Sequence, residues 1–352
     1  MKVWEKNIRK VVPYTPGEQP EGKDIIKLNT NENPYPPSPK VLEAKANLAK
    51  LRLYPDATAK NLVSVLAEYH GLKENQIFVG VGSDDVLAMC FLTFFNSEKP
   101  IVFPDITYSF YDVWAELFNI PYVTKALNDS FELVAKDYYG ENGGVIFPNP
   151  NAPTGLIADL DFIKDVLEHN QDVIVIVDEA YIDFGGESAV SLLKEYENLI
   201  VVRTFSKSRS MAGIRIGYAM GNAELIQYLN DVKYSYNSYT MNYPSLVLGV
   251  ESVKDETYFK DTVSKVVATR EWFEEELTRL GFTYPKSSSN FVFATHKTVP
   301  AKEIFEAARK EKIYVRYFDK PRIDNYLRIT IGTDEEMKKF VAFLEKTLGY
   351  NS

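Results

Sequence analysis

Cysteine and histidine are scarce in this chain of 352 residues. The single cysteine, Cys90, excludes a disulfide within the chain and is typical of a protein from a reducing compartment. The three histidines, His70, His169 and His296, do not lie at metal-ligand spacing from one another. The sequence therefore predicts neither an intrachain disulfide nor a histidine-based metal site.

Long apolar runs and a surplus of basic residues are missing as well. The apolar run at residues 91–95 is far too short to span a bilayer, and no apolar core of signal-peptide length follows Met1. The chain contains 40 Lys and Arg against 49 Asp and Glu, a formal net charge of −9. This charge disfavours nucleic acid and anionic membrane surfaces as partners. We expect a soluble, cytoplasmic protein without either partner.

Repeated strand–helix units fill most of the chain. Short apolar runs rich in Val and Ile predict strands at residues 77–81, 100–103, 144–147, 173–177 and 199–202. Helical patterns follow the first three runs, at residues 84–95, 108–118 and 159–170. Because the strand runs are continuous rather than alternating, they indicate burial on both faces of a mainly parallel sheet. The predicted fold class is α/β, with helices on both faces of that sheet.

The two ends of the chain have a different character. Residues 1–28 contain several prolines and glycines and predict an irregular arm. A long helix at residues 255–280, followed by strands at 290–294, 313–318 and 326–331 with helices between them, predicts a smaller α+β lobe. We therefore expect an arm at 1–28 that packs with the small lobe, a large domain at 29–244 and a small C-terminal domain at 245–352.

Polar residues follow the predicted strands. In an open parallel sheet, ligands bind beyond the carboxyl ends of the strands, so these residues are expected to meet. In chain order they are Gly82-Ser83-Asp84, Tyr108, the segment around Asn151, Asp178 with Tyr181, and the segment around Lys207.

Each of these residues has an ordinary structural interpretation beside a functional one. Lys207 is either a solvated loop residue or a Schiff-base lysine beside a phosphate, which Arg215 eight positions later would bind. Asp178 either caps the next segment or keeps a heteroaromatic ring nitrogen protonated. Ser83 with Asp84 forms either a helix N-cap or part of a phosphate seat. The third glycine of a dinucleotide fingerprint is missing, because residue 85 is Asp85.

The order of four motifs extends this pattern. They are N-P-N-A-P-T-G with Asn151, D-E-A-Y with Asp178 and Tyr181, S-K-S with Lys207, and G-I-R-I-G-Y with Arg215. Together with N-E-N-P at residues 31–34 and Y-P-D at residues 54–56, this order resembles the fold-type I pyridoxal-phosphate aminotransferases over nearly the whole chain. It looks most like the histidinol-phosphate aminotransferase family.

The resemblance implies pyridoxal 5'-phosphate (PLP) as cofactor and a role for each matching residue. Lys207 would hold the cofactor aldehyde as a Schiff base and move the proton in catalysis. Asp178 would pair with the pyridine nitrogen, and Tyr108 would stack on the ring. Asn151 and Tyr181 would contact the ring hydroxyl oxygen. The implied phosphate contacts are backbone groups of Gly82, Ser83 and Asp84, together with Thr204, Ser206 and Arg215. In a homodimer, Tyr54 would reach the phosphate of the neighbouring subunit.

The substrate is less well determined by the sequence. Arg316 and Arg328 each interrupt a predicted apolar strand and match family arginines that bind the distal anion of the substrate. Tyr14 and Asn33 are the other implied substrate contacts. We expect amino transfer between histidinol phosphate and 2-oxoglutarate, in histidine biosynthesis. An aromatic amino-acid aminotransferase, a threonine-phosphate decarboxylase-like lyase and a non-catalytic binding protein remain alternatives, and Ser235 replaces a proline usual in the family.

Overall fold

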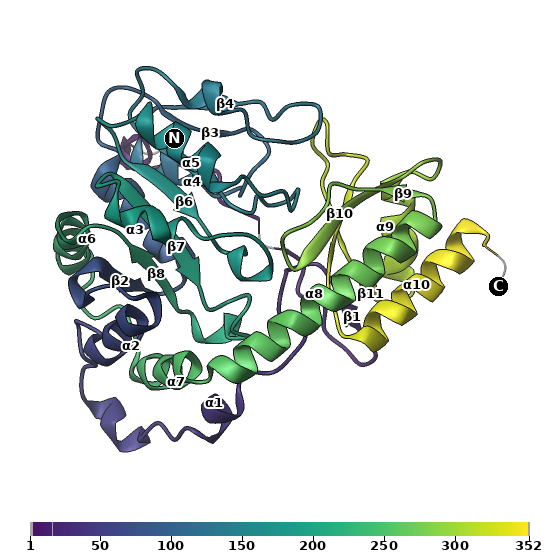
Figure 1. Ribbon diagram of the computed structural model, residues 1–352, viewed down its shortest axis with the longest axis horizontal. Coiled ribbons are helices and arrows are strands. Elements are labelled where there is room, and N and C mark those ends of the chain that lie inside the picture. The colour runs from purple at the N-terminus through teal and green to yellow at the C-terminus, as the bar shows by residue number, and fades with distance from the viewer. Residues whose placement is uncertain (1–2, 16, 351–352) are drawn as a thin grey trace.

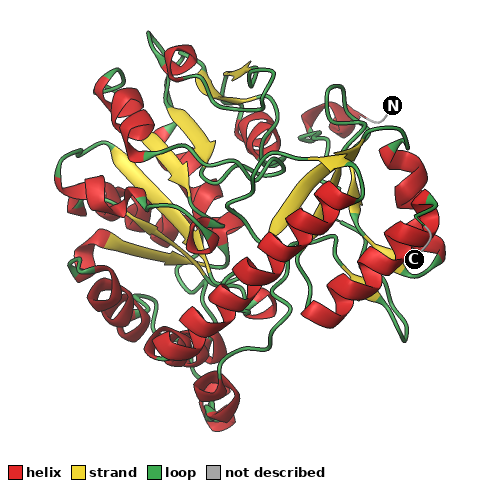
Figure 2. Cartoon of the chain, turned by 45° about the vertical axis from the view of Figure 1, so that its right-hand side comes forward, coloured by secondary structure: helices red, strands yellow, loops and turns green. Residues whose placement is uncertain are grey.

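The computed structural model describes residues 3–15 and 17–350. A large lobe and a smaller lobe lie side by side, and the long helix α8 (Glu256–Arg279) runs from one to the other (Figure 1; Figure 2). The large lobe contains a seven-stranded sheet, and the small lobe contains a four-stranded sheet and a two-stranded pair.

The large sheet is mainly parallel, which confirms the predicted fold class. Its strand order is β2-β8-β7-β6-β5-β3-β4. Only β8 is antiparallel to its neighbours β2 and β7, and the other four pairings are parallel. The strands are β2 (Ile77–Gly80), β3 (Ile101–Pro104), β4 (Tyr122–Lys125), β5 (Val145–Pro148), β6 (Val175–Asp178), β7 (Leu199–Thr204) and β8 (Gly217–Met220).

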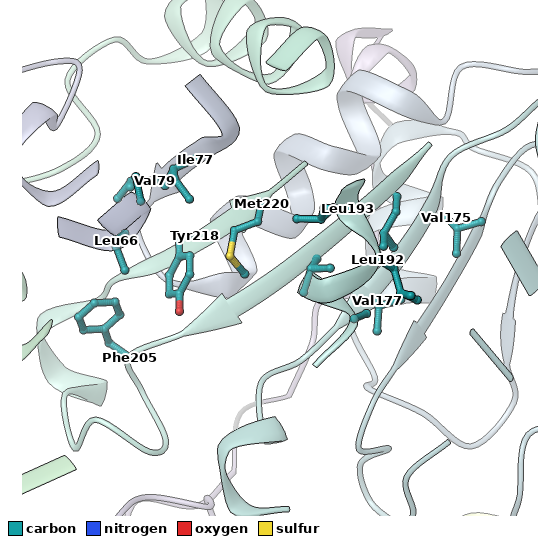
Figure 3. Packing of buried hydrophobic residues seen from close by; sticks show 14 of the residues in the cluster. Leu66, Ile77, Val79, Val175, Val177, Leu192, Leu193, Phe205, Tyr218 and Met220 are labelled. Atoms are coloured by element: carbon teal, nitrogen blue, oxygen red, sulfur yellow. The ribbon is translucent and has the colours of Figure 1, made fainter. Parts of the chain in front are cut away.

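Alternate side chains of each central strand enter two different cores. In β6, Val175 and Val177 belong to one core and Ile176 to the other, and all three are fully buried. Helices α2 (Lys60–His70), α5 (Leu160–Glu168) and α7 (Tyr243–Lys254) contribute to the first core, part of which Figure 3 shows. Helices α3 (Ser83–Phe94), α4 (Tyr111–Phe118) and α6 (Ala223–Tyr236) contribute to the second. The large lobe therefore has three layers.

The small lobe is built on an antiparallel sheet of order β12-β13-β10-β9. Its strands are β9 (Phe282–Thr283), β10 (Phe291–His296), β12 (Arg316–Tyr317) and β13 (Leu327–Thr330). Helices α8, α9 (Ala301–Lys310) and α10 (Asp334–Leu348) share its core. Strand β1 (Ile26–Lys27), from the N-terminal arm, pairs in parallel with β11 (Ile313–Tyr314), so this part of the arm packs on the small lobe.

The remaining elements are short. They are α1 (Pro39–Glu43) and the 3-10 helices η1 (Val3–Asn7), η2 (Leu48–Arg52), η3 (Glu74–Gln76), η4 (Ala135–Tyr138), η5 (Ile182–Phe184), η6 (Ala189–Lys194) and η7 (Ala212–Ile214). Within residues 3–15 and 17–350, no helix is long and apolar enough to cross a membrane. The same residues contain no cluster of three or more His, Cys, Asp or Glu that could hold a metal ion.

The structure adds strands that the sequence patterns did not predict. Strands β4 and β8 are absent from the prediction, and the strand expected at 313–318 is divided between β11 and β12. Helix α7 shares a core with the large lobe, although the predicted boundary at residue 245 assigns it to the small domain. The division of the chain into domains stays a prediction.

Candidate active site

Three neighbouring strands bring the predicted cofactor residues to one edge of the large sheet. Asp178 is the last residue of β6, Asn151 lies three residues beyond the end of β5, and Lys207 lies three residues beyond the end of β7. These strands pair in parallel, with Asp178 in register with Pro148 on one side and Val202 on the other. Their carboxyl ends therefore lie together, as expected for a ligand site of an α/β sheet.

Asp178 has one carboxylate oxygen that lacks a partner. Its Oδ2 accepts a hydrogen bond of 3.0 Å from the hydroxyl of Tyr111, whereas its Oδ1 is buried without a partner. Burial raises the pKa of Asp178 to about 7, because the charged form has lost its hydration. A cationic N–H group at Oδ1 would restore the charged carboxylate. The arrangement fits a protonated pyridine nitrogen.

Asn151 also has a buried oxygen without a partner. Its Nδ2 donates to the carbonyl oxygen of Ile106 at 3.1 Å and to Thr154 Oγ1 at 3.0 Å, while its Oδ1 has no partner. The peptide bonds before Pro150 and Pro153 are both cis. The amide is thus held with a free acceptor, which fits a hydroxyl donor on a bound ring.

The side-chain nitrogen of Lys207 lies between Thr30 and Tyr181. Its Nζ donates to the carbonyl oxygen of Thr30 at 3.1 Å and lies 5.7 Å from the centre of the Tyr181 ring. The side chain of Asn33 donates to the carbonyl oxygens of Lys207 and Ser208, each at 3.2 Å. Asn33, predicted as a substrate contact, therefore supports the lysine segment in this structure.

A buried ionic network also supports the segment that contains Lys207. Ser208 Oγ donates to Asp183 Oδ2 at 2.5 Å. Arg203, on β7, pairs with both Asp183 at 3.3 Å and Glu179 at 3.0 Å. The Arg203 charge and the Ser208 hydrogen bond counteract burial and keep the pKa of Asp183 below its ordinary value. The segment after β7 is consequently fixed at both flanks of Lys207.

Two glycines make room for Arg215 at the start of α3. A Cβ added to Gly82 would lie 2.4 Å from Arg215 Nη2, and one added to Gly217 would lie 2.3 Å from the carbonyl carbon of Gly82. Gly82 is the N-cap of α3 and supplies no capping side chain. Arg215 Nη1 lies 3.4 Å from Ser206 Oγ, which accepts a hydrogen bond from Thr204 Oγ1 at 3.0 Å. Helix N–H groups, hydroxyls and a guanidinium form a seat that fits a phosphate.

The side chain of Asp84 contacts two neighbours of the phosphate seat. It accepts a hydrogen bond of 2.7 Å from the Tyr108 hydroxyl and lies 3.4 Å from Arg215 Nη2. A carboxylate repels a phosphate, so Asp84 fits the phosphate seat through its backbone N–H alone. Its side chain instead orients Tyr108 and Arg215.

A pocket of about 340 Å³ opens beside these residues and is lined by Tyr14, Tyr108, Arg316, Phe318, Arg322 and Arg328, among others. Arg316 and Arg328 are direct cross-strand partners in β12 and β13. Burial first, and then the neighbouring charge of Arg316, lower the pKa of Arg328, whose buried Nε has no hydrogen-bond partner. Like charges opposite each other are unfavourable in a sheet, so the pair fits an anionic group.

Tyr14 and Tyr54, the two aromatic residues predicted from the resemblance, occupy different cavities. Tyr14 lines the pocket of the arginines and packs on Phe110 with ring centres 4.2 Å apart. Tyr54 lines a separate cavity of about 650 Å³ and is 81% exposed, with its ring stacked on Tyr239. Tyr54 is thus not among the residues that line the pocket of the arginines in its own chain.

Comparison with known proteins agrees with this geometry. The family model for class I and II aminotransferases matches residues 23–344. The chain is 52% identical to the histidinol-phosphate aminotransferase of Clostridium botulinum (strain Langeland), over 99% of each chain. It is 51% identical to that of Lactococcus lactis subsp. lactis (strain IL1403), over 99% of this chain and 97% of the relative.

The chain belongs to the histidinol-phosphate aminotransferase family of class I and II aminotransferases. The fold is that of the histidinol-phosphate aminotransferase from Sinorhizobium meliloti solved in complex with pyridoxal-5'-phosphate. The two structures share a TM-score of 0.84 at 22% sequence identity, over 92% of this chain and 91% of the other. Aminotransferases of this family use PLP.

Three residues of this aminotransferase site escaped the sequence analysis. Tyr111 bonds to Asp178, Asn31 donates to the Tyr181 hydroxyl at 2.9 Å, and Arg322 lines the pocket of the paired arginines. Two of them lie close to residues with a predicted role, because Tyr111 follows Tyr108 by three residues and Asn31 opens the N-E-N-P motif. No pattern around Arg322 distinguished it from a surface arginine.

Proposed function

We propose that this aminotransferase binds PLP at the strand ends and transfers the amino group of glutamate to imidazole-acetol phosphate. The products are histidinol phosphate and 2-oxoglutarate, and the reaction belongs to histidine biosynthesis in the cytoplasm. The observation that carries the proposal is the facing pair Arg316 and Arg328. The pair lines a pocket that also contains Tyr108, next to the partnerless oxygens of Asp178 and Asn151.

Lys207 performs two tasks in this proposal. Bound PLP would supply an electron sink for the charge that develops at the substrate's α-carbon. The Lys207 amine would hold the cofactor through its aldehyde carbon. Its Nζ would also move a proton to or from the substrate's α-carbon. The Thr30 carbonyl, 3.1 Å from Nζ, holds the amine at the start of this cycle.

Asp178 would keep the pyridine ring of the cofactor electron-withdrawing. Its carboxylate would accept the N–H of the pyridine ring and keep this nitrogen protonated. Tyr111 fixes the carboxylate through Oδ2. Asn151 and Tyr181 would contact the ring hydroxyl oxygen, and Tyr108 would stack on the ring. Backbone N–H groups of Ser83 and Asp84 would hold the phosphate together with Thr204, Ser206 and Arg215.

A second copy of the chain completes the site. Leu42, Leu48, Leu51, Leu53 and Tyr54 are between 52% and 81% exposed, a cluster of large apolar side chains in one segment. Such a surface marks a protein interface. We propose a homodimer in which Tyr54 of each subunit reaches the phosphate of the other.

Arg316 and Arg328 accept both substrates because a guanidinium pair binds a carboxylate and a phosphate alike. Glutamate offers its distal carboxylate, and histidinol phosphate offers its phosphate. Tyr14 covers the substrate. Ser235 is not among the residues that line this pocket; it is exposed on α6, and its Oγ donates to the Asp231 carbonyl at 2.8 Å.

Single-turnover absorbance changes with a panel of amino donors test the substrate assignment. Glutamate and histidinol phosphate are expected to consume the bound aldehyde much faster than phenylalanine or tyrosine. Faster conversion by the aromatic amino acids would assign the protein to aromatic amino-acid transfer. Release of carbon dioxide from threonine phosphate without a 2-oxo acid would identify a lyase.

A further inference from the structure

The two substrate-binding arginines lie on one hairpin, which we call the arginine hairpin: residues 316–330, comprising β12, a connecting segment and β13. Besides Arg316 and Arg328 it carries Phe318 on the pocket wall. Phe318 lies 5.5 Å from the Arg316 guanidinium and 5.7 Å from that of Arg328. Any movement of the hairpin therefore displaces the anion site as a unit.

The connecting segment of the hairpin reaches across to the large lobe through Arg322. Its Nη1 donates to Asp105 Oδ2 at 3.1 Å. Its Nη2 donates to the carbonyl oxygens of Leu127 and Asn128, at 2.7 and 2.9 Å. In Figure 1 the yellow-green segment of the small lobe meets the teal loop beyond β4 at this place. One side chain thus makes three hydrogen bonds between the lobes.

Apolar contacts surround these hydrogen bonds. Ile323 is 4% exposed and shares a small core with Ile106, Leu127, Phe131 and Phe293. The first three belong to the large lobe, and Phe293 lies on β10 of the small lobe. The contact is therefore a built junction with polar and apolar parts.

The large-lobe side of the junction leads directly to the cofactor residues. Asp105 follows β3, and its Oδ1 accepts the backbone N–H of Leu127 at 3.0 Å. The next residue, Ile106, accepts the Asn151 amide, and Tyr108 lies two residues further on. Arg322 consequently connects the arginine hairpin to the loop that holds both Asn151 and Tyr108.

The backbone of Arg322 is strained. Its φ is 71°, in the left-handed region that favours glycine and disfavours a long side chain. Such a conformation persists where the surroundings determine it, and here the side-chain hydrogen bonds across the lobes do so.

We propose that Arg322 is a positioning residue that clamps the arginine hairpin onto the large lobe and thereby keeps Arg316 and Phe318 at the substrate pocket. It acts on substrate affinity through the hairpin and leaves cofactor binding alone. The substrates named in its test rest on the proposed function, whereas the clamp itself does not.

The test uses the PLP-loaded full chain with Arg322→Ala, Arg322→Lys and Arg322→Gly. Arg322→Ala is expected to raise KM for glutamate and for histidinol phosphate on the order of tenfold, since it removes charged hydrogen bonds that are partly screened by solvent. The cofactor absorbance is expected to stay unchanged and kcat to fall less than threefold. Arg322→Lys keeps the charge without the forked geometry and should recover only part of the affinity.

Two further variants separate the clamp from other effects. Arg322→Gly relieves the backbone strain, so its KM matches that of Arg322→Ala if the side chain is what matters. A wild-type KM in the glycine variant would overturn the proposal. Arg309→Ala removes an exposed arginine whose ion pair with Glu18 at 2.8 Å does not reach the large lobe, and it should leave KM unchanged.

Hydrogen exchange of residues 316–330 and 127–131 measures the clamp without a substrate. Exchange in both segments is expected to accelerate together in Arg322→Ala and in Asp105→Asn, and the double variant should show no additional effect. Unchanged exchange in Arg322→Ala would overturn the clamp whichever substrate is used. Accelerated exchange with a raised KM for glutamate, but no reaction with histidinol phosphate, would support the clamp and refute the proposed substrate.

Discussion

Replacing Asp178 by asparagine is predicted to stabilise the protein without its cofactor while removing its activity. The substitution keeps the shape of the side chain and an oxygen that accepts the Tyr111 hydroxyl, 3.0 Å away in the native protein. It removes the charge and places an amide Nδ2 where the partnerless Oδ1 lies. In the cofactor-free chain this charge is buried beside a partnerless oxygen, so its removal relieves a cost of folding.

The expected gain in unfolding free energy follows from the raised pKa of Asp178. Burial raises the pKa of Asp178 from 3.8 to about 7, a difference of about 3 units that corresponds to about 4 kcal/mol. Because the folded-state pKa is the higher one, the native protein loses this stability as the pH rises from about 4 to above 7. By this linkage, Asp178→Asn should exceed the wild type in unfolding free energy by about 2 kcal/mol at pH 5 and about 4 kcal/mol at pH 9.

Urea unfolding of both cofactor-free proteins at pH 5, 7 and 9 measures this difference. With PLP bound, the variant should instead lose activity by about a hundredfold or more, because the ring nitrogen lacks its anionic partner. Site residues that are costly to stability and necessary for function are a known compromise. A variant less stable than the wild type at pH 9, or a difference that does not change with pH, would refute the assignment of Asp178 as an uncompensated buried carboxyl.

Two other substitutions test the substrate and phosphate sites separately. Arg328→Ala should raise KM for glutamate about a hundredfold, because the substrate loses charged hydrogen bonds. The spectrum of the bound cofactor should stay intact. Loss of the cofactor in this variant would contradict the separation of the substrate site from the phosphate site. Gly82→Ala places a Cβ 2.4 Å from Arg215 Nη2 and should weaken PLP binding about tenfold or more in a fluorescence titration. Gly213→Ala, whose added Cβ meets nothing within 4 Å, is its matched control and should bind PLP normally.

Much of this site could be predicted from the sequence because a parallel sheet gathers its strand ends. Asp178 and Lys207 each follow an unmistakable apolar run, so the position of each run determines where the side chain lies. Strand β8 (Gly217–Met220) was missed because its first two residues belong to the motif that contains Arg215, and its four residues form no long apolar run. Strand β4 was missed because three of its four residues are exposed.

Long-range contacts explain why other parts of the site could not be predicted from the sequence. Asn33 was predicted to contact substrate, and its bonds to the carbonyls of Lys207 and Ser208 join residues 174 and 175 positions apart. The contact between Arg322 and Asp105 spans 217 positions. No local pattern encodes such pairs, because they depend on how two lobes meet. The contacts of the Asp84 side chain with Tyr108 and Arg215 could not be predicted from the sequence for the same reason.

Reduction of the PLP-loaded protein with borohydride, followed by peptide mass mapping, tests the central claim most directly. The reduced cofactor is predicted on Lys207 alone, and the protein with Lys207→Ala should yield no adduct. A cofactor trapped on another lysine, or none trapped on a protein that has been incubated with PLP, would contradict the account.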